Sequence, residues 1–365
     1  MGMHTARDSL RWHLIETSPG AFDFSSALPM IRAARESGIQ VIWDLMHYGW
    51  PDDLDILSPE FIHRFAAFAR AAAGILQEET QGAPIICPIN EISFFSWAAG
   101  EVAYFYPFLN RRGEEVKEQM IRAAIAAMEA IWEVAPDARF VHCDPLIHVT
   151  AHPKRPHQKA AAERHRRSQF QSWDMISGRR KAHLGGHPKY LDIIGANYYI
   201  HNQWIHGGGP NSLLPPKHEL HRPIWEILQE IHARYQRPIF IAETGIEAEE
   251  RPAWLRYISN QAREAIHNGV PISGLCLYPI CNHPGWDDER HCHNGLWDYA
   301  DEAGGREIFA PLEIELKQQQ QAFEAFMAGE GSTPFMHDGA PSPELQDAAR
   351  KMKRLSEFGR KRRRR

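Results

Sequence analysis

Cysteine is scarce in this sequence, and its few copies do not indicate a disulfide framework. The chain has five, an odd number: Cys87, Cys143, Cys276, Cys281 and Cys292. Three of them lie in or beside apolar, strand-like runs, where a reduced thiol behaves as a small hydrophobic side chain. We therefore expect a reducing compartment and predict a cytoplasmic location.

Long hydrophobic runs are also absent. No apolar stretch approaches the roughly 18 residues of a membrane-spanning helix. The first ten residues, MGMHTARDSL, lack the apolar core that a signal peptide needs. The sequence therefore predicts no membrane partner.

The body of the protein lacks an excess of positive charge. The formal net charge is −5 and the pI is near 6.5, which does not favour nucleic acid as a partner. Residues 351–365 are the exception, with nine basic residues and one acidic residue. We interpret this end as a solvated tail, with contact to nucleic acid or another acidic surface as the alternative. Nothing here predicts an oligomeric state.

No glycine-rich phosphate-binding loop follows the early apolar runs, which argues against an open nucleotide-binding sheet. What the sequence does contain is seven short apolar runs, rich in Ile, Val and Leu, that alternate with longer amphipathic stretches. Runs without polar alternation are typical of strands covered on both faces, as in a parallel sheet. The seven candidate strands are 9–12, 41–45, 85–89, 139–143, 193–197, 239–242 and 273–277.

The amphipathic stretches between these runs have helical periodicity. One begins with Ser58 as a predicted N-cap and Pro59 at the first helical position, and similar stretches cover 114–134, 251–268 and 311–329. Repeated strand–helix alternation predicts an α/β architecture with right-handed crossovers. This pattern alone leaves both a closed barrel and an open doubly wound sheet as options.

Several apolar runs end in polar side chains. In a barrel, the carboxyl ends of all strands open on one mouth, where the active site is built. Residues distant in sequence would then face one pocket. The polar residues at these ends are Arg11, Asp44, His47, Asn90, Glu91, Asn197, Tyr198, Tyr199 and Glu243.

Two of these residues are glutamates, Glu91 and Glu243, and a pair of carboxyl groups is what cleavage of a glycosidic bond requires. One carboxyl must be protonated to donate to the leaving oxygen, and the other must be ionised to attack the anomeric carbon. Asn90 is placed to bond a sugar hydroxyl. Arg11 and a tyrosine are candidates to keep the nucleophile ionised, because a nearby cation lowers a carboxyl pKa.

At these residues the sequence resembles glycoside hydrolase family 1, the β-glucosidase family of retaining (β/α)8-barrel enzymes. Residues 10–54, which include Arg11 and the His47–Tyr48 pair, resemble the second and third barrel strands of that family. PINEIS resembles its acid/base motif, IGANYY its Asn-Tyr-Tyr motif and IAETG its nucleophile motif. The stretch GLWDYAD at 295–301 resembles the end of its eighth βα unit.

The resemblance implies a (β/α)8 barrel over residues 1–329. The residues that follow predict a linker over 330–342 and a tail over 343–365 that is helical and then disordered. It implies hydrolysis with retention, with Glu243 as nucleophile and Glu91 as acid/base, acting on a β-linked saccharide or glycoside without a metal or cofactor. Tyr199 would contact the nucleophile. The predicted substrate-binding residues are Arg11, His47, Asn90, Asn197, Tyr199, Tyr278, Trp286 and Asp287, and Trp50 and Trp97 are further candidates for stacking on sugar rings.

The sequence also departs from the family pattern. Ile92 and Thr244 replace a proline and an asparagine in the two glutamate motifs. In the loop 278–295, Trp286 with Asp287 or Asp288 takes the place of the usual Glu-Trp pair that grips the sugar. Strands 2 to 8 of the barrel are visible, whereas the first strand, with its sugar-binding glutamine, is not.

Other functions remain open from the sequence. The 21 histidines and the RHCHNG segment at 290–295 suggest a metal-dependent barrel hydrolase, although the early strands carry no His-x-His ligand pair. The altered sugar loop suggests a non-catalytic carbohydrate-binding relative. Transglycosylation stays possible as well, because the same covalent intermediate serves both reactions.

Overall fold

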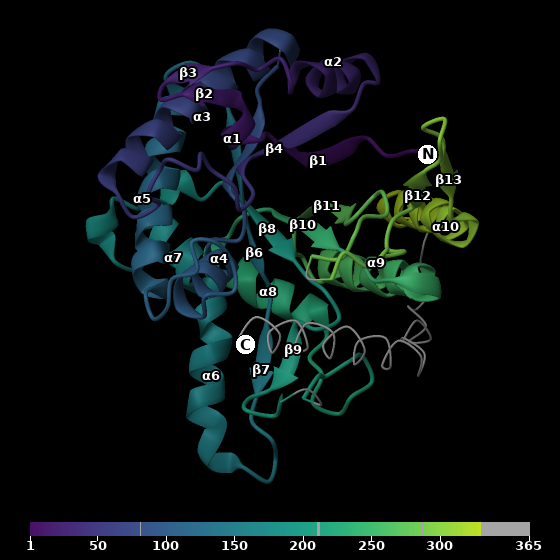
Figure 1. The fold of residues 1–365 in the computed structure, drawn as a ribbon. Coiled ribbons are helices and arrows are strands. Elements are labelled where there is room, and N and C mark those ends of the chain that lie inside the picture. The colour runs from purple at the N-terminus through teal and green to yellow at the C-terminus, as the bar shows by residue number, and fades with distance from the viewer. Residues whose placement is uncertain (81, 210–211, 287, 330–365) are drawn as a thin grey trace. The chain divides into compact units, whose positions relative to one another are not determined.

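A computed structural model describes residues 1–80, 82–209, 212–286 and 288–329 of the chain (Figure 1). Asp287, the predicted linker 330–342 and the predicted tail 343–365 lie outside the described residues. The main sheet has seven strands in the order β1-β4-β5-β6-β8-β10-β11. Their bounds are β1 Thr5–Ser9, β4 Gln40–Met46, β5 Ile85–Ile89, β6 Arg139–Pro145, β8 Ile193–Asn197, β10 Ile239–Thr244 and β11 Ile272–Leu277.

Six of the seven predicted strands coincide with observed strands, and β5 and β8 have the predicted bounds. The first prediction, residues 9–12, is wrong: the strand is β1, Thr5–Ser9, and the helical turn α1, Trp12–Ile15, follows it. Trp12 lies in this turn and is buried in the core, where its ring stacks on Phe68 with centroids 5.5 Å apart. The apolar character of 9–12 therefore reflects packing of a turn as well as of a strand.

The remaining elements are helices and short strand pairs. None of the helices in the described part of the chain has the length and apolarity needed to cross a membrane. The helices are α2 Leu28–Glu36, α3 Pro59–Thr80, α4 Ile92–Phe95, α5 Gly113–Trp132, α6 Lys159–Arg167, α7 Gln171–Ile176, α8 Ile224–Tyr235, α9 Arg251–His267 and α10 Ala310–Met327, with the π-helical segment η1 Ser96–Glu101. The 3-10 segments are η2 Pro156–Gln158, η3 Ser168–Phe170, η4 Ala182–Leu184, η5 Pro188–Tyr190 and η7 Ala248–Glu250. The short strands are β2 Glu16–Ser18, β3 Ala21–Phe22, β7 His148–Thr150, β9 Gln203–Ile205, β12 Trp297–Ala300 and β13 Arg306–Ile308.

The described residues of the predicted body, 1–329, fall into two compact units. We call the first the Glu91 unit; it comprises Met3–Pro145 and Ser168–Ala196. We call the second the Glu243 unit; it comprises Met1–Gly2, Leu146–Arg167 and the described residues from Asn197 onward.

The Glu91 unit contains the parallel strands β1, β4, β5 and β6. In this register Asp8 of β1 lies beside Trp43 of β4, and Ile42 of β4 lies beside Ile85 of β5. Helices α3 and α5 pack side by side (Figure 1). Phe61, Phe65 and Phe68 on the apolar face of α3 are completely buried, so burial of this face holds the helix in place.

The Glu243 unit contains the parallel pair β10 and β11, with α9 packed against both α8 and α10 (Figure 1). Trp254 of α9 is buried, and its ring stacks on that of Tyr198 with centroids 6.0 Å apart. Its indole N–H also donates to the hydroxyl of Thr244, at 2.9 Å. The end of β10, where Glu243 lies, is therefore fixed by the helix behind it.

Candidate active site

In the Glu91 unit, strands β1 and β4 and the residue that follows β5 bring an arginine, an aspartate and an asparagine together. The Arg7 guanidinium donates to both Asp44 carboxylate oxygens, at 2.9 and 2.7 Å, and to the Asn90 amide oxygen, at 2.5 Å. Asp44 is 1% exposed. Burial favours its neutral form, but the charge of Arg7 and the hydrogen bonds with His47 and Arg7 outweigh burial and lower its pKa.

His47 and Asn90, both predicted site residues, belong to this cluster. The His47 Nδ1 atom lies 2.8 Å from Asp44 Oδ2, and its Nε2 atom lies 3.2 Å from the Asn90 amide nitrogen. The amide nitrogen is a donor, so Nε2 acts as the acceptor and Nδ1 carries the proton that is donated to Asp44. This network fixes both polar side chains in single orientations.

Glu91 follows Asn90 directly, and its carboxyl accepts a hydrogen bond from the Tyr48 hydroxyl, with an O–O distance of 2.5 Å. The residue is 8% exposed. Its backbone has φ 47° and ψ 56°, the left-handed region that non-glycine residues seldom adopt. The Tyr48 ring stacks on Phe95, at 5.7 Å, which holds the hydroxyl donor in position.

The structure places the predicted residue Arg11 apart from this cluster. Arg11 is exposed and precedes the helical turn α1. The arginine that the first strand contributes is Arg7, which the sequence reasoning missed because the strand was placed four residues too late. The sequence signal for Arg7 was the short run TARDS, which contains this arginine. In the structure this run is β1, which pairs with β4.

Aromatic rings extend outward from Tyr48. Its ring contacts Phe105, at 5.7 Å, and the rings continue through Phe94 to Trp97, which is 39% exposed. Trp50, the other aromatic candidate on this side, is buried, and its indole N–H donates to a backbone carbonyl. Trp97 is therefore the better placed of the two for contact with a ligand.

In the Glu243 unit, Glu243 lies inside strand β10 and is 8% exposed. The Tyr199 hydroxyl donates to Glu243 Oε2, at 2.9 Å, which is the contact predicted for Tyr199. The backbone of Glu243 is bonded as well, because its carbonyl accepts from the Tyr198 N–H at 2.9 Å. The carboxyl group and the main chain of this residue are therefore both fixed.

Tyr278 contacts the Tyr199 ring, and Asn197 lies two positions before Tyr199 in the chain. The Tyr199 ring packs edge-on against Tyr278, at 6.5 Å, and parallel to His201, at 5.6 Å. Asn197 is fully buried at the end of β8, where its carbonyl accepts from the Leu146 N–H. The structure thus brings together Tyr199, Glu243 and Tyr278, with Asn197 at the end of the preceding strand.

The loop 278–295 has a polar scaffold. Its centre is Asn282, whose side-chain oxygen accepts from the Gly295 N–H, at 2.7 Å, and whose amide donates to Asp298, also at 2.7 Å. Trp286 is 55% exposed, and its predicted partner Asp287 lies outside the described residues. The alternative partner, Asp288, is exposed and lies 3.5 Å from Arg290.

The RHCHNG segment lies in the same loop. His291 and His293 contact the ring of Tyr299, with centroids 4.7 and 6.2 Å apart, and Cys292 is buried between them in sequence. Across the described ranges, no three His, Cys, Asp or Glu side chains are grouped so that they could hold a metal ion.

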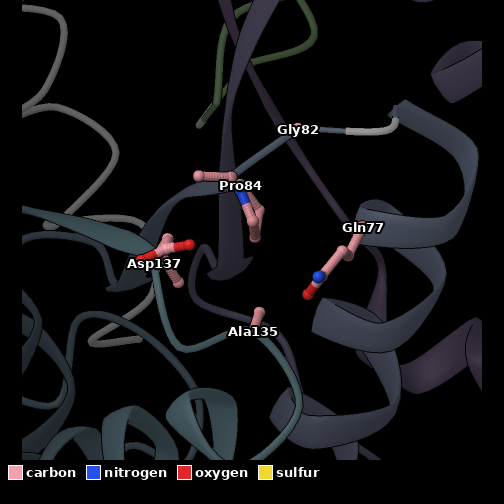
Figure 2. A pocket seen from close by; sticks show the side chains of 7 residues that line it. Gln77, Gly82, Pro84, Ala135 and Asp137 are labelled. Carbon is pink, nitrogen blue, oxygen red and sulfur yellow. The ribbon is translucent and has the colours of Figure 1, made fainter.

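Two pockets lie away from these clusters. The first, of about 320 Å³, lies at the amino ends of β5 and β6, where Gln77, Pro84 and Asp137 line it (Figure 2). It is therefore at the opposite end of β5 from Asn90. The second, of about 550 Å³, lies beside β7 and α6. Its arginines, Arg166 and Arg222, both pair with Glu230.

By sequence, no protein-family model and no curated protein matches this chain.

Comparison by structure finds close similarity of fold. The β-glucosidase from Thermotoga maritima in complex with glucoimidazole is similar with a TM-score of 0.72 and 16% identity over 86% of this chain and 83% of that one. For the AHE enzyme from Alicyclobacillus herbarius, the TM-score is 0.72 and the identity 16%, over 88% of this chain and 83% of that one. For a hyperthermophilic β-glucosidase mutant, the TM-score is 0.70 and the identity 18%, over 86% of this chain and 84% of that one. The fold is therefore of the (β/α)8-barrel type of the family 1 β-glucosidases, with seven strands in the main sheet of the described residues. Both the barrel and the lack of its first strand agree with the prediction from the sequence resemblance.

Proposed function

We propose that this protein is a retaining β-glycosidase that hydrolyses O-glycosidic bonds by double displacement. The observation that carries the proposal is shared by the two predicted glutamates. Each lies at the carboxyl end of a strand of a β-glucosidase fold, and each carboxyl accepts a hydrogen bond from a tyrosine hydroxyl. Carboxyl groups fixed in this way meet the need for positioned groups in acid/base and nucleophilic catalysis.

In the first step, Glu243 acts as the nucleophile. The Tyr199 hydroxyl donates to Oε2 of Glu243, and a carboxylate oxygen of Glu243 attacks the anomeric carbon. A bond forms between this oxygen and the sugar while the bond from the sugar to the leaving oxygen breaks. Glu91, protonated at this stage, gives its proton to the leaving oxygen.

In the second step, Glu91 acts as a base. It takes a proton from water, whose oxygen attacks the anomeric carbon and releases Glu243 as a carboxylate. Two inversions give net retention, and the proposal requires the two carboxyl groups to lie about 5–5.5 Å apart.

Substrate contacts are proposed for the groups around each glutamate. Arg7 and Asp44 orient Asn90 and His47, which then present fixed polar atoms to sugar hydroxyls. We assign to Arg7 the role that the sequence predicted for Arg11, that of the arginine on the first strand. In the Glu243 unit, the exposed ring of Trp286 and the half-buried ring of Tyr278 are proposed to stack on the sugar. We also retain the proposal of a cytoplasmic location, which the free thiols of all five cysteines support.

The experiment that tests the proposal is a screen of aryl β-glycosides with the full chain, with the anomeric configuration of the first-formed product followed by NMR. We expect hydrolysis with retention by the wild-type protein and none by the Glu243→Gln variant. Hydrolysis with inversion, or equal rates for wild-type protein and variant, would contradict the proposal.

A second candidate is a non-catalytic carbohydrate-binding protein. It is favoured by the loop 278–295, where exposed Trp286 stands in place of the usual sugar-gripping pair. Saccharide binding measured by calorimetry, without turnover of any glycoside, would support it. Transfer of the sugar to an added alcohol, in preference to water, would instead identify a transglycosidase.

A further inference from the structure

Asp144 is a buried carboxyl group that the proposed reaction does not use. It is the last residue but one of β6, in the Glu91 unit, and it is 1% exposed. Both of its oxygens are occupied: Oδ1 accepts from the Ser93 N–H, at 3.0 Å, and Oδ2 accepts from the Ser93 hydroxyl, also at 3.0 Å. The Ser172 hydroxyl of α7 also donates to Oδ2.

These bonds fix the segment that carries Glu91. The end of β6 contacts this segment twice, because the Cys143 carbonyl accepts from the Glu91 N–H, at 3.0 Å, and the next residue, Asp144, bonds Ser93. The segment then closes on itself through the Phe95 N–H, which donates to the Glu91 carbonyl at 2.8 Å. Glu91 is thus held from both sides.

Such support is needed because of the backbone conformation of Glu91. A left-handed conformation is unfavourable for a glutamate and persists only where the surroundings impose it. The Glu91 side chain does not cap the first turn of α4. Asp144 caps this turn instead, because its carboxylate accepts hydrogen bonds from both the N–H and the hydroxyl of Ser93. The left-handed turn and this distant cap together set the direction of the Glu91 side chain.

We propose that Asp144 is a positioning residue for Glu91, which it holds, through Ser93, in the orientation required to protonate the leaving oxygen. The inference rests on the proposed function, since it assigns a part in the same acid/base step. It adds a residue that lies 53 positions after Glu91 in the chain.

The charge state of Asp144 matters for this contact. The groups that face its carboxyl are Ser93 of α4, Ser172 of α7 and Lys117 of α5. Burial raises the pKa of Asp144 to about 6, against the opposing effect of these donors and of the Lys117 charge. Above this pH the carboxylate accepts from all three donors; below it, one oxygen carries a proton and the hold on Ser93 weakens.

The experiment compares Asp144→Ala with Asp192→Ala in the full chain. Asp192 is the matched control, because its carboxylate bonds Arg139 and the Phe140 N–H at the other end of the same strand. The rate of the first step, taken from kcat/KM, is measured with aryl β-glycosides of good and poor leaving groups. For Asp144→Ala we expect a loss of about tenfold or more with poor leaving groups and a small loss with good ones, because only the former depend on Glu91 as acid. The control variant should show the same leaving-group dependence as the wild-type protein.

Two further variants keep the test decisive. Asp144→Asn retains an oxygen that accepts from the Ser93 N–H, so it should restore most of the rate and remove from the pH profile the inflection near pH 6 that Asp144 contributes. Ser93→Ala, a smaller change that serves if Asp144→Ala does not fold, should reproduce its leaving-group dependence in weaker form. Equal losses with good and poor leaving groups in Asp144→Ala and Ser93→Ala would overturn the proposal.

Hydrogen exchange separates this proposal from the proposed function. In Asp144→Ala, and not in Asp192→Ala, we expect faster exchange of the Ser93 and Phe95 amides. A wild-type protein that hydrolyses no glycoside refutes the proposed function, and exchange then still decides whether Asp144 holds the segment. Unchanged exchange at Ser93 in Asp144→Ala overturns the inference in either case.

Discussion

The two glutamates are held by different means. Glu243 lies inside β10, all six residues of which are buried, so the pleat of a regular strand directs its side chain. Glu91 lies beyond the end of β5 in a left-handed turn. Its carboxyl accepts from Tyr48, and its segment donates to Cys143 and Asp144; these hydrogen bonds direct the side chain. The proposed nucleophile therefore belongs to the scaffold itself, whereas the proposed acid/base depends on a set of individual contacts.

The largest effect is expected for Glu243→Gln. The amide is almost the same shape as the carboxylate but is not a nucleophile, so kcat should fall by roughly 10⁴-fold or more with every substrate. Because the strand positions the residue, circular dichroism and the melting temperature should remain close to those of the wild-type protein. Substantial activity in this variant would mean that another group attacks the sugar.

The next largest effect is expected for Glu91→Gln, and it should depend on the substrate. With poor leaving groups the first step should slow by roughly 10²- to 10⁴-fold, since it loses general acid catalysis. With good leaving groups the first step should be nearly normal, and the covalent intermediate should accumulate and give a burst of released phenol. A uniform loss across leaving groups would count against an acid/base role.

Asp144→Asn should change how stability depends on pH. The pKa of Asp144 in the folded protein is about 6, above its ordinary value of 3.8. Between these values the folded state binds more protons than the unfolded state, so this group lowers the free energy of unfolding as pH rises from about 4 to about 6. Over this pH range, the free energy of unfolding of the wild-type protein, measured with urea, should therefore fall by about 3 kcal/mol relative to that of the variant. A constant difference between the two proteins would contradict the assigned pKa.

The smallest effect is expected for Tyr199→Phe. It removes one hydrogen bond to the Glu243 carboxyl, and bonds to charged groups contribute about 1.5–3 kcal/mol, so kcat should fall by about tenfold or somewhat more. The matched control is Tyr190→Phe, which removes a similar bond, of 2.7 Å, to Glu129 on the outer helix α5. The control should leave kcat unchanged, and equal losses in both variants would show that the Tyr199 effect is one of stability.

Much of the fold was predictable from the sequence, because buried parallel strands leave a clear pattern of short apolar runs. β5 and β8 were predicted with their observed bounds. The first strand was misplaced because Leu10 and Trp12, which are apolar, are buried in the turn that follows β1 and not in the strand. That error led to the prediction of Arg11 in place of Arg7.

The candidate site was predictable only in part. The motifs around Glu91, Tyr199 and Glu243 pointed to these residues, and the Tyr199–Glu243 contact is present in the structure. The contact between Asp144 and Ser93 had no local signal, since it depends on the pairing of β5 with β6 and joins residues 51 positions apart. Contacts of this kind follow from the packing of strands and leave no periodic pattern in the sequence.

The central claim is that Glu243 forms a covalent bond to the sugar, and trapping that intermediate tests it most directly. A 2-deoxy-2-fluoro aryl β-glycoside with a good leaving group slows both steps and lets the glycosyl-enzyme accumulate. Mass spectrometry of a protease digest should find one sugar per chain, on the peptide that contains Glu243. A label on Glu91, or turnover of the natural glycoside without any label, would contradict the proposed mechanism.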